Sequence, residues 1–153
     1  MQRIASFQID HTRLEPGMYT SRADGDVVTY DLRFVRPNTP PYLETAAMHT
    51  IEHLFATYVR NSTQGEAVIY FGPMGCRTGF YLILAGDYES ADIVPLLKEM
   101  FAFISEYEGE IPGAAPEACG NYLDLNLPMA KYVAKRYLTE VLENITRERL
   151  NYQ

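Results

Sequence analysis

Residues 27–41 read VVTYDLRFVRPNTPP, and this stretch, together with the pattern that follows it, decides the fold class. Its first nine residues are rich in β-branched and aromatic types in partial alternation, which predicts a strand over 27–35. The proline-containing run at 37–41 then ends the strand. Apolar residues recur at helical spacing from Leu43 to Val59, so we expect a helix over about 43–61.

Further strands and helices follow along the chain. The sequence predicts strands over 67–71 and 79–85, rich in aromatic and branched residues. It also predicts a helix over 90–101, with Ser90 as its N-cap, and a last helix over 129–144. Grouped strands with interspersed helices indicate the α+β class, and the even composition indicates a single domain over the whole chain, residues 1–153.

The composition argues against several kinds of partner. Thirteen Lys and Arg against twenty Asp and Glu give a formal charge of −7. Nucleic-acid binding needs a concentrated basic surface, and anionic membranes attract basic proteins, so neither partner is expected. No apolar run approaches the roughly 20 residues that span a bilayer. The N-terminal residues lack the apolar stretch of a signal peptide, so we expect a cytoplasmic protein with two free cysteines.

The segment HTIEH, residues 49–53, carries the strongest chemical signal. On a helix His49 and His53 lie one above the other, and Glu52 lies on the same side, so two imidazoles can reach one ion beside a carboxylate. The alternative is a pair of histidines that only pack or face solvent. The chain has three histidines in all, and two of them stand at metal-binding spacing, which favours a metal. The same His-x-x-Glu-His order occurs in inverzincin peptidases, so the motif alone does not define the reaction.

Cys119 is a candidate third ligand. It precedes Gly120 in a loop with several prolines and glycines, where the backbone could pass close to the helix. A His, His, Cys set leaves a fourth position for water or substrate, as in catalytic sites. Taken alone, Cys119 is better interpreted as a small buried hydrophobic residue.

Three other residues are candidates for catalysis or binding. Cys76 follows GPMG and precedes Arg77, so it should lie near a turn, where a thiol can act as acid, base or nucleophile. An inert core cysteine, or a disulfide with Cys119, are the alternatives. Arg33, in a predicted strand, and His11, after a short strand-like N-terminal segment, could bind a polar substrate or form surface ion pairs.

Taken together and in order, these motifs resemble the S-ribosylhomocysteine lyase (LuxS) family over residues 6–120, and the last predicted helix fits as well. The matching blocks are SF at 6–7, DHT at 10–12, DLRF at 31–34, PN at 37–38, HTIEHLF at 49–55, PMGCRTGFY at 73–81 and CG at 119–120.

The resemblance implies a fold and a set of roles. The fold would be an α/β sandwich with an antiparallel sheet packed by helices. His49, His53 and Cys119 would bind one divalent metal per subunit, iron(II) in the physiological form, with zinc or cobalt able to substitute. Glu52 and Cys76 would be the general acid and base. The remaining roles concern the substrate: Ser6, His11 and Arg33 would hold it.

The resemblance also implies the reaction and the partners. S-ribosylhomocysteine would be cleaved to homocysteine and 4,5-dihydroxy-2,3-pentanedione, the precursor of the quorum-sensing signal autoinducer-2, as part of the methyl cycle. The family forms homodimers with active sites at the interface, so Ser6, His11 and Arg33 would serve the partner's metal. One departure stands out: Tyr70 occupies a position where many relatives have Asp.

Two rival functions remain open at this point. A metallopeptidase would use Glu52 to activate water, but it would take a carboxylate as third ligand and would need a longer chain to form a peptide-binding cleft. A non-catalytic metal-binding protein would have a closed coordination sphere and no use for Cys76.

Overall fold

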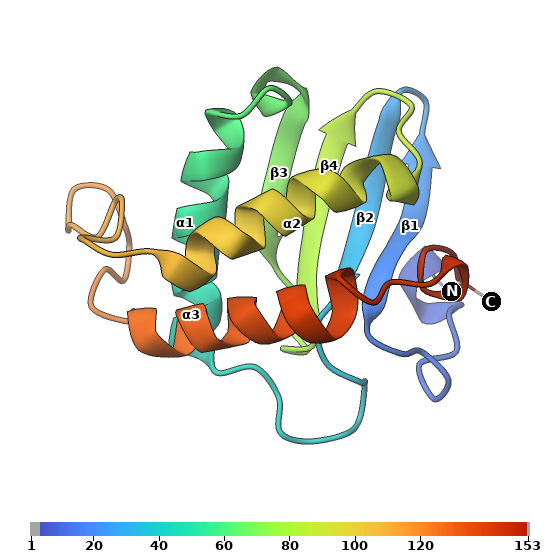
Figure 1. Cartoon of the computed structure of the whole chain (residues 1–153), viewed down its shortest axis with the longest axis horizontal. Helices are drawn as coiled ribbons and strands as arrows, with labels where there is room; N and C mark the ends of the chain where they lie inside the picture. Colours follow the sequence, from blue (N-terminus) through green and yellow to red (C-terminus); the bar gives the residue numbers. More distant parts are fainter. Residues whose placement is uncertain (1–3, 153) are drawn as a thin grey trace.

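The chain forms a four-stranded antiparallel sheet in the order β1-β2-β4-β3, with helices on one face. This arrangement is seen in a computed structural model, which describes residues 4–152 (Figure 1). Residues 1–3 and 153, which the single-domain prediction includes, lie outside the described residues. The strands are β1 Gly17–Asp24, β2 Val27–Arg33, β3 Val68–Pro73 and β4 Gly79–Ala85. The α+β prediction is confirmed.

Three helices cover that face of the sheet. They are α1 Thr45–Arg60, α2 Ser90–Glu106 and α3 Leu127–Arg136, and α3 continues as a π-helical turn, Tyr137–Leu142. Short 3-10 turns complete the chain at Ala5–Phe7, Gly65–Ala67 and Arg147–Arg149. Helix α1 contacts β3 and both other helices, and the loop between α2 and α3 lies beside α1 (orange in Figure 1).

Most element predictions are confirmed to within a few residues, two are wrong and one strand is missing from them. The strand Gly17–Asp24 was not expected. The N-terminal segment contains a 3-10 turn instead of a strand. Glu89, not Ser90, is the N-cap of α2: Glu89 and Asp92 bond each other's backbone in a capping box, while the Ser90 hydroxyl lies 2.6 Å from that of Thr20.

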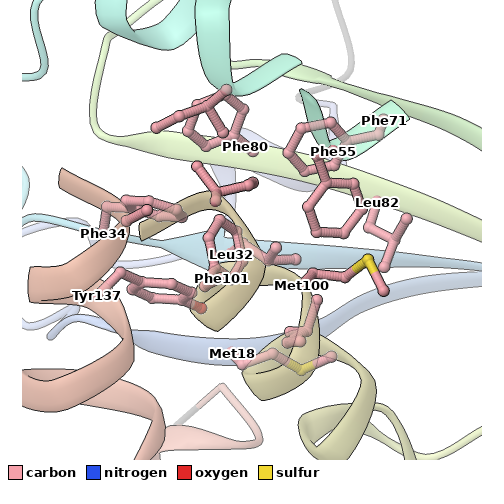
Figure 2. Packing of buried hydrophobic residues seen from close by; sticks show 14 of the residues in the cluster. Met18, Leu32, Phe34, Phe55, Phe71, Phe80, Leu82, Met100, Phe101 and Tyr137 are labelled. Carbon is pink, nitrogen blue, oxygen red and sulfur yellow. The ribbon is translucent and has the colours of Figure 1, made fainter. Parts of the chain in front are cut away.

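Strand β2 shows how the sheet separates an apolar face from a polar one. Its alternate residues Tyr30 and Leu32 are fully buried against the helices. Figure 2 shows Leu32 packed with aromatic side chains of the core, where the Phe34 and Tyr137 rings stack at 3.8 Å. Asp31 and Arg33 point to the opposite face, as period-two alternation requires, and yet both are buried. A buried ion pair on the face away from the helices therefore needs a separate explanation.

Candidate active site

Helix α1 positions the first group of functional side chains. The Glu44 carboxylate caps the helix by accepting hydrogen bonds from the backbone N–H groups of Ala46 and Ala47, at 3.2 and 2.8 Å. His49, Glu52 and His53 then lie within the helix and are all partly buried. The helix begins and ends within two residues of its predicted bounds, so the spacing argument holds.

The structure brings His49, His53 and Cys119 together. Their ligand atoms all lie within 4.8 Å of one another. The two Nε2 atoms are 3.0 Å apart, and Cys119 Sγ lies 3.3 Å from His49 Nε2. In a tetrahedral site with bonds near 2 Å, ligand atoms are separated by about 3.4 Å. The cluster therefore has the dimensions of a metal site.

The orientation of the imidazole rings supports the same conclusion. His49 Nδ1 lies 2.8 Å from the carbonyl oxygen of Asp124, and His53 Nδ1 lies 2.7 Å from that of Pro112. A carbonyl only accepts, so each Nδ1 carries the proton and each Nε2 of a neutral ring presents a lone pair. Two lone pairs that face each other at 3.0 Å repel, and a cation between them would replace that repulsion with two bonds. The donor set fits a divalent metal.

The loop that carries Cys119 lies against helix α1 on both sides of Cys119 in the sequence. The backbone N–H of Asn126 donates to the buried Thr50 hydroxyl at 2.8 Å. A Cβ on Gly113 would lie 3.2 Å from His53 Nδ1, and Gly113 has φ +73°, a conformation that favours glycine. A Cβ on Gly120 would meet nothing within 4 Å. The glycine that permits close approach is thus Gly113, and the expectation for Gly120 is wrong.

The second group of predicted residues lines a separate cavity of about 550 Å³. Ser6, His11, Arg33 and Cys76 all contribute to its wall, as does the half-buried Tyr81. His11 is oriented by a contact of 2.9 Å from its Nδ1 to the Ile9 carbonyl.

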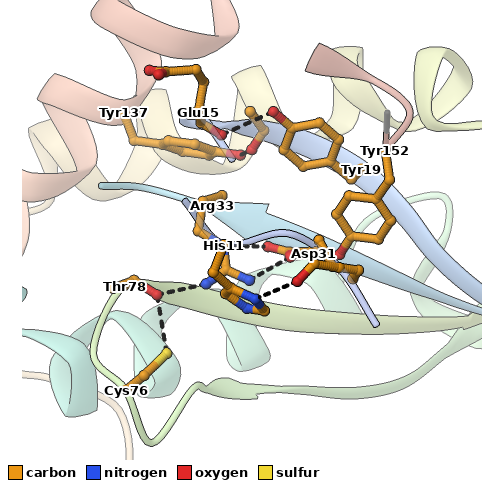
Figure 3. Close-up of polar contacts among 11 residues, drawn as sticks. His11, Glu15, Tyr19, Asp31, Arg33, Cys76, Thr78, Tyr137 and Tyr152 are labelled. Atoms are coloured by element: carbon orange, nitrogen blue, oxygen red, sulfur yellow. Dashed lines mark hydrogen bonds and ion pairs between the residues drawn. The ribbon is translucent and has the colours of Figure 1, made fainter. Parts of the chain in front are cut away.

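Cys76 lies in the turn between β3 and β4, as predicted. Its Sγ is 3.0 Å from the Thr78 hydroxyl, whose oxygen accepts a hydrogen bond of 2.6 Å from Arg33 Nη1 (Figure 3). Arg77, the basic neighbour in sequence, has φ +59° and is exposed, with its guanidinium 6.0 Å from the Tyr42 ring. Arg33, which reaches the thiol through Thr78, is thus a second basic residue near Cys76, and no sequence pattern indicated this proximity.

Asp31 holds the Arg33 guanidinium from the other side. Its Oδ2 accepts from Arg33 Nη2 at 2.5 Å and its Oδ1 from Nε at 3.1 Å. Burial alone would lower the pKa of Arg33, but the Asp31 charge and hydrogen bonds outweigh burial, so this pKa is raised. Tyr152 also donates to Asp31 Oδ2, at 2.6 Å. Sequence reasoning missed Asp31, Thr78 and Tyr152. Thr78 and Tyr152 reach this site through the sheet register and a distant segment, whereas Asp31, two residues before Arg33 on the same face of β2, could have been found from strand alternation.

The metal cluster and the cavity do not share residues within one chain. Over the described residues 4–152, the cavity wall includes none of His49, His53 and Cys119, nor Glu52. Both cysteines are free thiols, so the alternative of a Cys76–Cys119 disulfide is not realised. No helix in the described part of the chain is long and apolar enough to cross a membrane.

The fold and the donor set together define a class: an α+β protein in which two histidines and a cysteine could hold one metal ion. The chain matches the S-ribosylhomocysteinase (LuxS) family over residues 4–148, and it belongs to that family. Similar proteins named S-ribosylhomocysteine lyase come from Clostridium acetobutylicum, Clostridium beijerinckii and Finegoldia magna. They are 59%, 58% and 57% identical to this chain, and each alignment covers 99% of both sequences.

Proposed function

We propose that the chain cleaves S-ribosylhomocysteine to homocysteine and 4,5-dihydroxy-2,3-pentanedione. The observation that carries this proposal is the similarity to named lyases over 99% of both chains, combined with a metal-binding cluster at the residues the resemblance implies. The thiol in that cluster also argues against the peptidase alternative, which would take a carboxylate as third ligand.

The chemistry explains why both an acid–base pair and a metal are required. The thioether bond of the substrate is several carbons from its aldose carbonyl. β-Elimination needs an acidic proton next to a carbonyl, so the carbonyl must first migrate along the sugar by proton transfers between adjacent carbons. A divalent ion on His49, His53 and Cys119 would stabilise negative charge on the substrate oxygens.

The chain's own side chains would move the protons. Glu52, on α1 beside the cluster, and Cys76, in the β3–β4 turn, would take protons from one carbon and return them to the next. In the last step a base removes the proton next to the carbonyl and the carbon–sulfur bond breaks. Its electron pair leaves with the homocysteine thiolate, so no external oxidant or reductant is needed.

Ser6, His11 and Arg33 would hold the substrate. They supply a hydroxyl, an imidazole and a guanidinium to one cavity wall, which suits a ligand rich in hydroxyl groups and carrying an amino acid. Because this cavity is separate from the metal cluster of the same chain, we propose that Ser6, His11, Arg33 and Cys76 face the metal of a second copy.

A homodimer also accounts for exposed apolar side chains on the open side of the sheet. Tyr70 is 46% exposed, and its partner on β4, Ile83, is only partly buried. Ile69, at the irregularity of β3 before Tyr70, is 49% exposed. Covering such a patch with a second copy would remove it from water. Tyr70, at the position where many relatives have Asp, would then be covered by the second copy. Within its own chain, the Tyr70 hydroxyl occupies the space where a Cβ on Gly72 would lie.

The metal, the compartment and the biological role belong to the same proposal. Iron(II) would be the physiological metal, with zinc or cobalt able to substitute. Two free cysteines suit a reducing cytoplasm, where the product would feed autoinducer-2 synthesis and homocysteine would return to the methyl cycle.

The test is release of free thiol from S-ribosylhomocysteine by protein purified without oxygen and loaded with iron(II). Wild-type protein should release thiol catalytically. Glu52→Ala and Cys76→Ala should lose turnover but keep one metal ion per chain, whereas Cys119→Ser should lose the metal as well. A folded, fully metallated wild-type protein that releases no thiol would overturn the proposal.

A further inference from the structure

A continuous set of hydrogen bonds joins Tyr152 to the thiol of Cys76. Tyr152 donates to Asp31, Asp31 accepts twice from Arg33, and Arg33 donates to Thr78. Thr78 contacts Cys76 Sγ at 3.0 Å. Figure 3 shows these side chains side by side, on the face of the sheet away from the helices. Arg33, Thr78 and Cys76 reach the cavity wall, whereas Asp31 and Tyr152 do not.

The chemistry of the groups determines the direction of these hydrogen bonds at every contact except the one to the thiol. A guanidinium only donates, so the Thr78 oxygen accepts from Arg33. The Thr78 hydroxyl proton is then free to donate to a Cys76 thiolate, whereas a protonated Cys76 thiol can itself donate to Thr78. At the other end, an ionised Asp31 only accepts, so the Tyr152 hydroxyl must donate. Burial raises the pKa of Tyr152, with Asp31 adding to the rise and a hydrogen bond from Ser21 opposing it, so the phenol stays protonated.

Burial makes this arrangement rigid. The side chains of Arg33 and Asp31 are only 3% and 0% exposed, so neither can exchange its partner for water. Charge-assisted bonds of this kind are short and directional. The guanidinium is therefore held by Asp31 and Thr78 in one orientation toward the cavity.

The segment that carries Tyr152 is attached to the edge of the sheet. The backbone N–H of Thr20 donates to the Leu150 carbonyl at 3.3 Å, and Thr20 forms a parallel bridge with Asn151. The Tyr152 ring stacks on that of Tyr19 at 5.0 Å. This docking on β1 delivers the phenol to Asp31.

We infer that Tyr152, Asp31 and Thr78 are positioning residues for the reaction. Together they fix the Arg33 guanidinium and, through the Thr78 hydroxyl, the sulfur of Cys76. The kinetic part of this inference rests on the proposed function, since it takes Cys76 to be the proton-transfer group. The structural part does not depend on the proposed function, because the reactivity of the Cys76 thiol can be measured directly by alkylation.

The test compares Tyr152→Phe with Tyr19→Phe. Both remove one phenol oxygen from the same ring stack, but the Tyr19 hydroxyl donates to the Glu15 carbonyl and not to Asp31. Tyr152→Phe should lower kcat for thiol release about fivefold with KM nearly unchanged, since substrate contacts remain while the acid–base group is less well placed. Tyr19→Phe should leave kcat at the wild-type value.

Alkylation supplies the second readout. In metal-free protein treated with iodoacetamide, Tyr152→Phe should slow modification of Cys76 by about threefold, because Arg33 and Thr78 then stabilise charge on the reacting sulfur less well. Cys119, followed in the same digest by mass spectrometry, should react at an unchanged rate. Thr78→Val should slow Cys76 by about tenfold, and Thr78→Ser, which keeps the hydroxyl, should restore the rate.

The outcomes separate the inference from the proposed function. Tyr152→Phe protein with wild-type kcat and wild-type alkylation would overturn the inference, and so would equal losses in Tyr152→Phe and Tyr19→Phe. If the wild-type protein released no thiol from S-ribosylhomocysteine, the proposed function would fail, and the alkylation rates alone would decide the inference.

Discussion

The ligands of the metal cluster and the thiol of Cys76, in the cavity wall, are oriented by different kinds of contact. His49 and His53 owe their proximity to four-residue spacing on α1, and backbone carbonyls of a neighbouring loop orient both rings. Cys76 lies in a turn and takes its orientation from buried side chains of the sheet and of a distant segment. A site that depends on local spacing is visible in sequence, whereas one that depends on side-chain contacts across the sheet is not.

This comparison predicts that the two regions respond to mutation independently. Asp31→Asn leaves the Arg33 charge buried without a counter-charge, and we expect it to lower the free energy of unfolding by about 3–5 kcal/mol. Metal content per folded chain should stay at the wild-type value. Denaturant unfolding and metal analysis of the same preparation check both statements, and loss of metal from folded Asp31→Asn protein would show that the regions are coupled.

Alkaline pH should lower the free energy of unfolding of the protein. Burial raises the pKa of Tyr19 and of Tyr30 to about 12, from a usual value of 10.0. The unfolded chain therefore loses these protons before the folded chain does, and stability that is complete below pH 10 is lost as the pH rises toward 12. The expected slope is about 1.4 kcal/mol per pH unit for each tyrosine. Unfolding curves at several pH values measure it, and Tyr30→Phe should remove one tyrosine's share; an identical slope in that variant would contradict the prediction.

A substitution in the loop beside the metal cluster should have a smaller effect, confined to metal affinity. Gly113→Ala would place a Cβ 3.2 Å from His53 Nδ1, so we expect metal affinity to fall about tenfold, as for other losses of ligand orientation. Gly109→Ala is the matched control: it lies in the same loop with φ +121°, but its Cβ would meet only the Tyr107 hydroxyl, at 3.9 Å. Competition titration with a chelator compares the two, and equal affinity losses would show that backbone strain, not crowding of His53, is responsible.

Much of the fold and the metal half of the site could be predicted from sequence. Periodic apolar residues located α1 to within two residues at each end, and the HTIEH spacing placed both histidines on one side of it. Strand β1 was missed because its sequence, GMYTSRAD, alternates poorly between apolar and polar residues and ends in a polar, exposed stretch. The cap of α2 was misplaced because Glu89 and Ser90 can both serve as caps, and only the Thr20 contact assigns the serine elsewhere.

The surroundings of Cys76 could not be predicted in the same way. Arg33 and Thr78 are 45 residues apart, and Tyr152 is 121 residues from Asp31. No periodicity links residues at such separations, since their contact depends on the register of β2 with β4 and on the docking of the 147–152 segment. Adjacency suggested Arg77 as the basic neighbour of the thiol, but the positive φ at that residue accompanies an outward-facing, exposed side chain.

We propose that the metal cluster of one chain and the Cys76 cavity of a second copy together form one lyase site. The most direct test is thiol release from S-ribosylhomocysteine by a mixture of two inactive proteins, Cys76→Ala and Cys119→Ser, unfolded together, refolded and loaded with iron(II). Half of the dimers would then be mixed, and each would hold one site with an intact metal cluster and an intact Cys76, so about a quarter of the wild-type activity should return. A mixture that remains inactive, although dimers have formed and exchanged, would contradict the account.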